Sequence, residues 1–117
     1  MSYLIRPALY GAYHEVVPVK NPSPITHHPS PMYDVVGPIC ESADVLARDR
    51  RLPKLGEGDR LAIFGAGAYG FVMASNYNGR LRPAEVIVKG ARWFLVRQRE
   101  TRDDLLRGET VPAGLMK

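Results

Sequence analysis

The sequence predicts an all-β domain, a Greek-key β-barrel or sandwich of about five to seven strands with one or two short helices. Short apolar runs rich in aromatic and β-branched residues recur along the chain, and these residue types favour strands. The 117 residues include 10 prolines and 11 glycines, which disfavour long helices because proline removes a backbone donor and interior glycine lowers helix stability. No long segment of helical periodicity separates the apolar runs, and the length fits one domain over residues 1–117.

The amino-terminal part is expected to consist of strands around a loop. Residues 8–19 (ALYGAYHEVVPV) are rich in aromatic and β-branched residues, which predicts one long strand or a bent pair, interrupted at Gly11 and Pro18. Residues 20–32 contain four prolines and no apolar periodicity, which predicts a loop. Strand character resumes over residues 33–38.

The middle of the chain is expected to change from a helical turn to a strand. Residues 41–49 predict a short helical turn, because Ser42 is a good N-cap. Apolar residues return there at helical spacing, at Ala43, Leu46 and Ala47. Residues 56–59 (GEGD) have the composition of a turn, and residues 60–64 (RLAIF) form a short apolar run that predicts a buried strand.

The carboxy-terminal part contains the clearest local signals. Residues 85–88 and 92–97 are apolar runs joined by a tight connection, which predicts a β-hairpin. Thr101 and Asp104 have the spacing of a capping box, which predicts a short helix over residues 101–107.

A glycine motif follows the strand expected in the middle of the chain. Residues 65–70 (GAGAYG) match the G-x-G-x-x-G pattern of dinucleotide-binding loops, and Glu85 lies where a ribose-binding acid is expected. That fold needs a helix directly after the glycines, because the amino terminus of the helix holds the pyrophosphate. Residues 71–78 offer at most about two helical turns. The pattern therefore disfavours dinucleotide binding, while the N–H groups of a glycine loop can still approach a phosphate.

Charge and composition argue against several classes of protein. The net charge is +4, with both signs spread along the chain, unlike the dense basic tract of a nucleic-acid binder. Residues 61–79 carry no charge, but their glycine, asparagine and serine content does not suit a membrane span. The amino end does not resemble a secretory leader, so we expect a cytoplasmic protein.

Cysteine and histidine offer few possibilities for chemistry. A single cysteine, Cys40, excludes an internal disulfide and a cysteine-rich metal cage. Cys40 is either an inert buried thiol or, beside Glu41 at a strand end, a group that gives or takes a proton. His14, His27 and His28 lack the partners of a metal site and are expected to be solvated loop residues, so no metal is predicted.

The remaining basic and aromatic side chains are expected to be structural. A basic run predicts a solvated face, and its members are Arg48, Arg50, Arg51 and Lys54. The tyrosines predict packing on strands, and those concerned are Tyr10, Tyr13, Tyr33 and Tyr69. Neither a Ser-His-Asp triad nor paired acids at a convincing spacing emerge. By themselves, the residues indicate a β domain with a phosphate-capable loop and one thiol.

Several segments nevertheless resemble one family, both in sequence and in order. The segments are RPALYGAYH at 6–14, VGPICES at 36–42, GAGAYG at 65–70, SNYN at 75–78, RPAEV at 82–86 and RET at 99–101. Together they are similar to the carboxy-terminal domain of the diaminopimelate decarboxylases. The resemblance covers nearly the whole chain and is more specific than the glycine pattern alone.

The resemblance implies a reaction and a set of site residues. The family consists of carboxy-lyases that use pyridoxal phosphate to release carbon dioxide from meso-diaminopimelate, which gives L-lysine. By resemblance, Arg6 and Tyr10 would contact the distal end of the substrate, and Glu41 would bind its distal ammonium. Cys40 would be the proton donor, and Tyr69 would contact the cofactor phosphate and the substrate. These residue types suit the roles, because arginine binds a carboxylate through two parallel hydrogen bonds and an acid must reprotonate the carbon.

The resemblance also implies partners. In the family, the lysine that binds the cofactor and most of the phosphate site lie on a separate barrel domain, and the active site forms at the interface of a homodimer. No lysine of this chain falls in the family's lysine motif, and the lysines are Lys20, Lys54, Lys89 and Lys117. We therefore expect the chain to hold half of a site, without the barrel domain, and to be inactive alone. No nucleic-acid or membrane partner is expected.

The sequence differs from the family pattern at two places, and two other functions are alternatives to a diaminopimelate decarboxylase. Residues 20–32 have no family signature, and Ala43 stands where the family is expected to have glycine. Related decarboxylases acting on ornithine or arginine share the fold type, but residues 6–10 and 40–41 favour diaminopimelate, whose second amino-acid head must be recognised. A non-catalytic interaction module that docks onto another barrel is the alternative from a different class.

Overall fold

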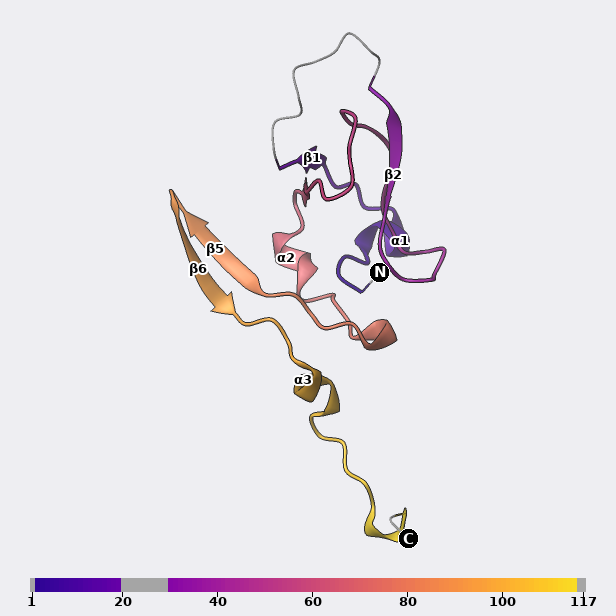
Figure 1. Ribbon diagram of the computed structural model, residues 1–117, viewed down its shortest axis with the longest axis vertical. Coiled ribbons are helices and arrows are strands. Elements are labelled where there is room, and N and C mark those ends of the chain that lie inside the picture. Colours follow the sequence, from indigo (N-terminus) through magenta and orange to yellow (C-terminus); the bar gives the residue numbers. More distant parts are fainter. Residues whose placement is uncertain (1, 20–29, 116–117) are drawn as a thin grey trace. The chain divides into compact units, whose positions relative to one another are not determined.

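Six strands form three separate two-stranded antiparallel sheets in the computed structural model, which describes residues 2–19 and 30–115 (Figure 1). Within these residues, three short α-helices and two 3-10 helices accompany the strands. The chain is therefore mostly sheet, as expected, with more short helices than expected. None of the described sheets closes into a barrel. The chain divides into two compact units, unit 1 over Met1–Ala74 and unit 2 over Ser75–Lys117.

Unit 1 contains two of the sheets and two helices. Strands β1 and β4 form one sheet, and β2 and β3 form the other. In chain order, the elements are α1 (Arg6–Tyr10), β1 (Val16–Pro18), β2 (Met32–Val36), β3 (Val45–Arg51), β4 (Leu61–Ile63) and α2 (Gly67–Gly70). The strands predicted at residues 33–38 and 60–64 are confirmed at their centres. Most of the loop predicted over residues 20–32 lies outside the described residues, and Met32 already belongs to β2.

Helix α1 corrects the strand predicted over residues 8–19. Pro7 lies in its first turn, where the missing N–H costs nothing and the fixed φ suits a helix. Gly11 ends the helix at a φ of +69°, and its N–H donates to the carbonyl of Pro7 at 3.1 Å. Strand character begins only at Val16, which pairs with Ile63 of β4.

Strand β3 corrects the helical turn predicted over residues 41–49. Its pairing with β2 runs from Met32 opposite Arg51 to Val36 opposite Val45. Ser42 and Ala43 form only a turn before the strand. The helical spacing of the apolar residues is therefore overridden by pairing with a strand about ten residues earlier in the chain.

The core of unit 1 joins its two sheets. Its buried residues are Val16 of β1, Ala47 of β3, and Leu52, which expose 6%, 3% and 4% of their surface. Partly buried side chains pack around them, namely Tyr33, Val35, Leu55, Leu61 and Ile63. Helix α1 also packs against β3. This core fixes the positions of α1, of the loop between β2 and β3, and of the glycine motif after β4.

Unit 2 consists of a hairpin followed by short helices. Its elements are η1 (Tyr77–Gly79), β5 (Glu85–Lys89), β6 (Arg92–Arg97), α3 (Arg102–Leu106) and η2 (Ala113–Leu115). The predicted hairpin is confirmed, with Gly90 at a φ of +60° in its turn. The predicted capping box is confirmed as well, because the backbone N–H of Thr101 donates to Asp104 Oδ2 at 2.8 Å. The Thr101 backbone N–H and hydroxyl hold the pKa of Asp104 below its ordinary value.

A glutamate joins three segments of unit 2. Glu100 Oε2 accepts the backbone N–H of Arg82 at 2.7 Å and the Asn76 side-chain amide at 2.6 Å. Its Oε1 forms an ion pair with the Arg82 guanidinium at 2.5 Å. These donors, led by the Arg82 side chain, lower the pKa of Glu100 from 4.5 to about 2. Since no described residue of unit 2 is buried, such polar contacts are its main tertiary ties.

Replacing Glu100 with glutamine is expected to destabilise unit 2 and to remove most of its acid sensitivity. Because folding lowers the pKa of Glu100 from 4.5 to about 2, its stabilising effect is full above pH 4.5 and is lost as the pH falls towards 2. Amide exchange of the Arg82 and Glu100 N–H groups, measured across this range, reports the effect. Glu109→Gln is the control, because Glu109 is an exposed glutamate of the same unit without a side-chain partner in the described residues. Equal acid sensitivity of the parent and Glu100→Gln chains would contradict the prediction.

Candidate active site

Three of the predicted site residues meet beside helix α1. Arg6 and Tyr10 lie four positions apart in the helix, so their side chains share one face. Arg6 Nε donates to the Tyr10 hydroxyl at 2.6 Å. The Arg6 guanidinium also lies over the Tyr69 ring, with its Cζ 4.0 Å from the ring centroid. Two segments far apart in the sequence thus form one cluster, which we call the arginine cluster: Arg6, Tyr10 and Tyr69.

His14 adjoins the arginine cluster, and its place corrects the expectation of a solvated loop residue. The side chain exposes only 2% of its surface. Its Nδ1 lies 2.9 Å from the carbonyl oxygen of Phe64, and its Nε2 lies 3.5 Å from Arg6 Nη1. His27 and His28, the other histidines with that expectation, lie outside the described residues. In the structure, exposed Tyr13 and Glu15 alternate with buried His14 and Val16, as alternate residues of an extended segment share a face.

The Arg6 guanidinium keeps donors available for a ligand. Its Nε is used by Tyr10 and its Nη1 faces His14, whereas Nη2 makes no hydrogen bond within the described part of the chain. A guanidinium has five N–H donors in a rigid fork that matches a carboxylate. The stacked and hydrogen-bonded Arg6 can therefore bind an anionic oxygen with little further loss of side-chain freedom.

Tyr69 belongs to the glycine motif at residues 65–70. Helix α2 covers only Gly67–Gly70, so it lies inside the motif, and residues 71–73 form turns. The helix that a dinucleotide fold requires after the glycines is not formed by the described residues 71–79, in line with the sequence reading. Tyr69 is 42% exposed, and its hydroxyl makes no hydrogen bond within residues 2–19 and 30–115. A side chain added at Gly67 or Gly70 would meet no atom within 4 Å, so the loop faces open space.

The other two predicted site residues lie together on the loop between β2 and β3. Cys40 is an exposed free thiol, and Glu41 is half-buried. The Glu41 N–H donates to the Ile39 carbonyl at 2.8 Å, which tightens the turn. Within the described residues, no hydrogen bond or ion pair joins Cys40 or Glu41 to the arginine cluster. The thiol and its neighbouring acid are therefore displayed on a loop of their own.

Asp44 holds this loop in shape, although nothing in the residue pattern indicates such a role. Asp44 exposes 3% of its surface, and its Oδ2 accepts the Ile39 N–H at 2.9 Å. Its backbone accepts the Gly37 N–H and donates to the Glu41 carbonyl, both at 2.8 Å. A Cβ at Gly37 would lie 2.5 Å from Asp44 Cγ, so only glycine fits there. The buried carboxylate thereby fixes the backbone on both sides of Cys40.

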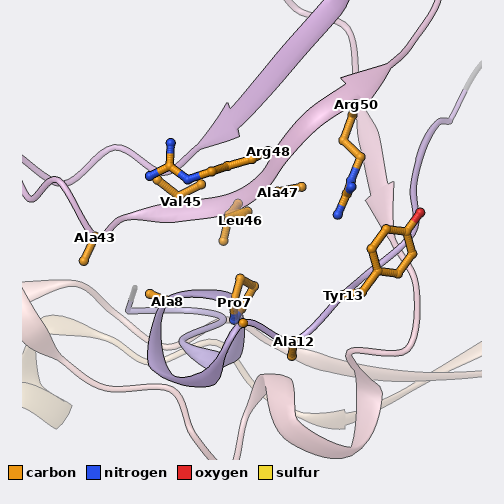
Figure 2. Close-up of a pocket in the computed structure, with 11 residues that line it drawn as sticks. Pro7, Ala8, Ala12, Tyr13, Ala43, Val45, Leu46, Ala47, Arg48 and Arg50 are labelled. Atoms are coloured by element: carbon orange, nitrogen blue, oxygen red, sulfur yellow. The ribbon is translucent and has the colours of Figure 1, made fainter.

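A cavity of about 400 Å³ lies between α1 and β3. Figure 2 shows Pro7 and Ala8 of α1 facing Leu46 of β3, with Arg50 directed towards Tyr13. The full lining comprises Pro7, Ala8, Gly11, Ala12, Tyr13, Ala43, Val45, Leu46, Ala47, Arg48 and Arg50. None of these side chains is a thiol, an acid or an imidazole. The cavity therefore lacks a thiol, acid or imidazole for proton transfer, and no residue of the arginine cluster lines it.

Half of the structural expectations for basic and aromatic residues needed revision. Arg48, Arg51 and Lys54 are exposed as expected, and Arg48 pairs with Asp34 at 3.5 Å. Arg50 is different, because its guanidinium lies 4.2 Å from the Tyr13 ring centroid and its Nε is buried without a hydrogen bond. Of the tyrosines expected to pack on strands, Tyr33 does so in the core, while Tyr10, Tyr13 and Tyr69 are exposed.

Residues 2–19 and 30–115 form neither a metal-binding cluster nor a helix that could span a bilayer. These residues contain no group of three His, Cys, Asp or Glu side chains placed to hold a metal ion. No helix formed by the described residues has the length and apolar content needed to cross a bilayer.

Comparison with known sequences identifies similar proteins. The family model described as pyridoxal-dependent decarboxylase, C-terminal sheet domain, matches residues 1–67. The diaminopimelate decarboxylase of Archaeoglobus fulgidus is 54% identical over 115 residues, which are 98% of this chain and 27% of that protein. The diaminopimelate decarboxylase of Methanothermobacter thermautotrophicus is 54% identical over 114 residues, or 97% of this chain and 26% of that protein.

Solved structures give the same picture. The diaminopimelate decarboxylase of M. jannaschii matches with a TM-score of 0.87 at 43% identity, covering 99% of this chain and 26% of that chain. The Helicobacter pylori diaminopimelate decarboxylase, solved in complex with L-lysine, matches with a TM-score of 0.78 at 41% identity, covering 92% and 25% of the two chains. The chain thus spans about a quarter of the length of these relatives.

Proposed function

The chain belongs to the pyridoxal-dependent decarboxylases, within their C-terminal sheet domain, and on this premise we propose that it supplies one wall of the active site of a diaminopimelate decarboxylase. The reaction would release carbon dioxide from meso-diaminopimelate and give L-lysine. The observation that carries the proposal is the arginine cluster, in which Arg6 is held by Tyr10 and Tyr69 with Nη2 left for a ligand. The relatives at 54% identity, named for this activity, support it.

The residues present fit part of a pyridoxal phosphate site. The Tyr69 hydroxyl lacks a hydrogen bond in the described residues, and the neighbouring glycines face open space, so a phosphate oxygen could accept from Tyr69. When bound, the cofactor supplies the electron sink for the bond cleavage. We assign the lysine that binds the cofactor to a barrel domain that pairs with this one, as the family resemblance implies.

Each predicted site residue has a task that its chemistry allows. The Arg6 guanidinium would bind the distal carboxylate of the substrate, with the Tyr10 hydroxyl beside it. Glu41 would bind the distal ammonium by charge. The Cys40 thiol would give a proton to the carbon that has lost carbon dioxide, and the thiolate would then regain a proton from solvent. The exposure of Cys40 supports this last step, because a donor must reach both substrate and water.

A homodimer and a closed barrel complete the proposal. Within the described residues, no hydrogen bond or ion pair joins Cys40 or Glu41 to the arginine cluster, which supports a site where this loop serves the second copy's arginine cluster. Among the described residues, each strand of the two small sheets of unit 1 is paired along one edge only, which supports their completion into a Greek-key barrel by strands from other parts of the enzyme.

A hybrid enzyme tests the function. This chain would replace the 115 matched residues of the Archaeoglobus fulgidus diaminopimelate decarboxylase, and the hybrid would be assayed for carbon dioxide and L-lysine with pyridoxal phosphate present. We expect turnover of meso-diaminopimelate and little turnover of ornithine or arginine. A folded hybrid that prefers ornithine or arginine would identify the related decarboxylases, and one that turns over none of them would contradict a catalytic role.

Arg6→Lys in this hybrid is expected to raise KM for diaminopimelate by about 10- to 100-fold with a smaller change in kcat. Lysine keeps the charge but cannot form the planar fork or stack on Tyr69 in the same way. Steady-state kinetics measure both constants. Arg48→Lys is the control, because Arg48 is an exposed arginine of the same unit that pairs with Asp34 instead. An unchanged KM in Arg6→Lys would remove Arg6 from substrate binding.

A further inference from the structure

We propose that His14 is a positioning residue, which sets the Arg6 guanidinium for the distal carboxylate of the substrate. This inference rests on the proposed function and deepens it. His14 does not reach the substrate in this account. Its imidazole contacts Arg6 on one side and the carbonyl of Phe64, at the end of strand β4, on the other.

The partners of the imidazole determine where its proton lies. Nδ1 is 2.9 Å from the Phe64 carbonyl oxygen, which can only accept, so Nδ1 must carry the hydrogen and donate. In the neutral ring, Nε2 then has a lone pair. That lone pair faces Arg6 Nη1 at 3.5 Å, and a guanidinium can only donate. The order of donors is therefore Arg6 to His14 to Phe64.

The far end of this chain of contacts is rigid. Phe64 directly follows β4, and its N–H donates to the Glu15 carbonyl at 2.8 Å, which continues the pairing of β1 with β4. The Phe64 carbonyl is thus fixed by the sheet. Since His14 exposes only 2% of its surface, its ring is also held by packing. The imidazole therefore holds the guanidinium at a fixed place relative to the sheet of β1 and β4.

The near end restrains a side chain that would otherwise be mobile. Tyr10 holds Arg6 at Nε, Tyr69 covers the guanidinium face, and His14 holds Nη1. Three contacts in different directions define the plane of the guanidinium and leave Nη2 directed to a ligand. Without His14, the arginine could still stack on Tyr69 but would turn in the plane of the ring, so fewer of its orientations would suit a carboxylate.

The binding of two ligands distinguishes this role of His14 from a general structural role. L-Lysine and cadaverine share the same five-carbon chain with an amine at each end, but only L-lysine has a carboxylate for Arg6. In the hybrid enzyme, calorimetry is expected to show L-lysine binding weakened about tenfold by His14→Phe, equivalent to about 1.4 kcal/mol, with cadaverine binding unchanged. Phenylalanine keeps the ring volume and removes both nitrogens. A loss shared equally by the two ligands would overturn the proposal, because it would report disturbed packing.

A double-mutant cycle with Arg6 gives an independent check. If His14 acts through Arg6, adding His14→Phe to Arg6→Ala should cause no further loss of L-lysine binding. Additive losses would overturn the proposal. His14→Gln serves if His14→Phe does not fold, since its amide oxygen can lie near the Nε2 position and accept from Arg6. Glutamine is expected to retain most of the preference for L-lysine over cadaverine, and loss of that preference as in Arg6→Ala would also overturn the proposal.

The two proposals fail in different ways. The proposed function is decided by turnover of diaminopimelate in the unsubstituted hybrid. The role of His14 is decided by ligand selectivity, which needs no turnover. An active hybrid whose selectivity is unaffected by His14→Phe would overturn only the inference about His14. An inactive hybrid that binds L-lysine through His14 and Arg6 would overturn only the proposed decarboxylase function.

Discussion

Replacing Cys40 with alanine in the hybrid enzyme is expected to lower kcat by about 10²- to 10⁴-fold, the usual contribution of a positioned general acid. Alanine removes the proton donor and leaves the backbone of the loop unchanged, because the loop is held by Asp44 rather than by the thiol. KM should change little, since substrate contacts are assigned to Arg6, Tyr10 and Glu41. Steady-state decarboxylation measures the effect.

The product formed in deuterated water shows whether the thiol delivers the proton. The parent hybrid should place deuterium at the ε-carbon of L-lysine in a single configuration, because a fixed donor approaches from one side. Cys40→Ala should give a mixture, since water can approach without that constraint. Glu41→Gln is the control variant at the neighbouring residue. It should raise KM, and its product should still carry deuterium in a single configuration. A Cys40→Ala enzyme with parental kcat and one configuration would show that the donor is another group.

Gly37→Ala is expected to destabilise unit 1 by about 1 to 3 kcal/mol and to disorder the Cys40 loop. The added methyl group would lie 2.5 Å from Asp44 Cγ, so it must displace a buried carboxylate that accepts the Ile39 N–H. Asp44 is a short side chain with little freedom to move away. The displaced acceptor leaves a buried N–H without its partner, which adds to the cost.

Urea denaturation combined with amide exchange at Ile39 measures this effect in the full chain. Gly56→Ala is the control, because its Cβ would find its nearest atom, Asp59 Oδ2, at an ordinary 3.8 Å. In the hybrid enzyme, Gly37→Ala should also lower kcat, since Cys40 would lose its fixed place. Parental exchange at Ile39 together with full activity would mean that Asp44 does not hold the loop.

Local signals predicted the structure well where the chain pairs or caps with its near neighbours. The hairpin of β5 and β6 depends on a tight turn between adjacent runs, and α3 depends on Thr101 and Asp104, three positions apart. Both were predicted from the sequence because the interacting groups are close along the chain. The family resemblance was equally accessible, because it lies in short segments such as residues 6–14 and 36–42.

The failures occurred where distant segments decide the outcome. Residues 41–49 carry helical spacing, but pairing with β2 makes Val45–Arg51 a strand. The aromatic and β-branched content of residues 8–19 favours a strand, but Pro7 and Gly11 start and end a helix at Arg6–Tyr10. His14 became a buried residue through Phe64, fifty positions later in the chain. No spacing rule could indicate that contact, nor the role of Asp44 behind the Cys40 loop.

The hairpin of unit 2 presents apolar side chains on both of its faces, because Val86, Ile87 and Val88 are consecutive and each is about half exposed or more. Trp93 and Phe94 on the paired strand are exposed as well. A ribbon of this kind adheres to other apolar surfaces until something covers it, and quality-control chaperones and proteases recognise such surfaces. We therefore expect the isolated chain to self-associate in solution, with this ribbon at the contact.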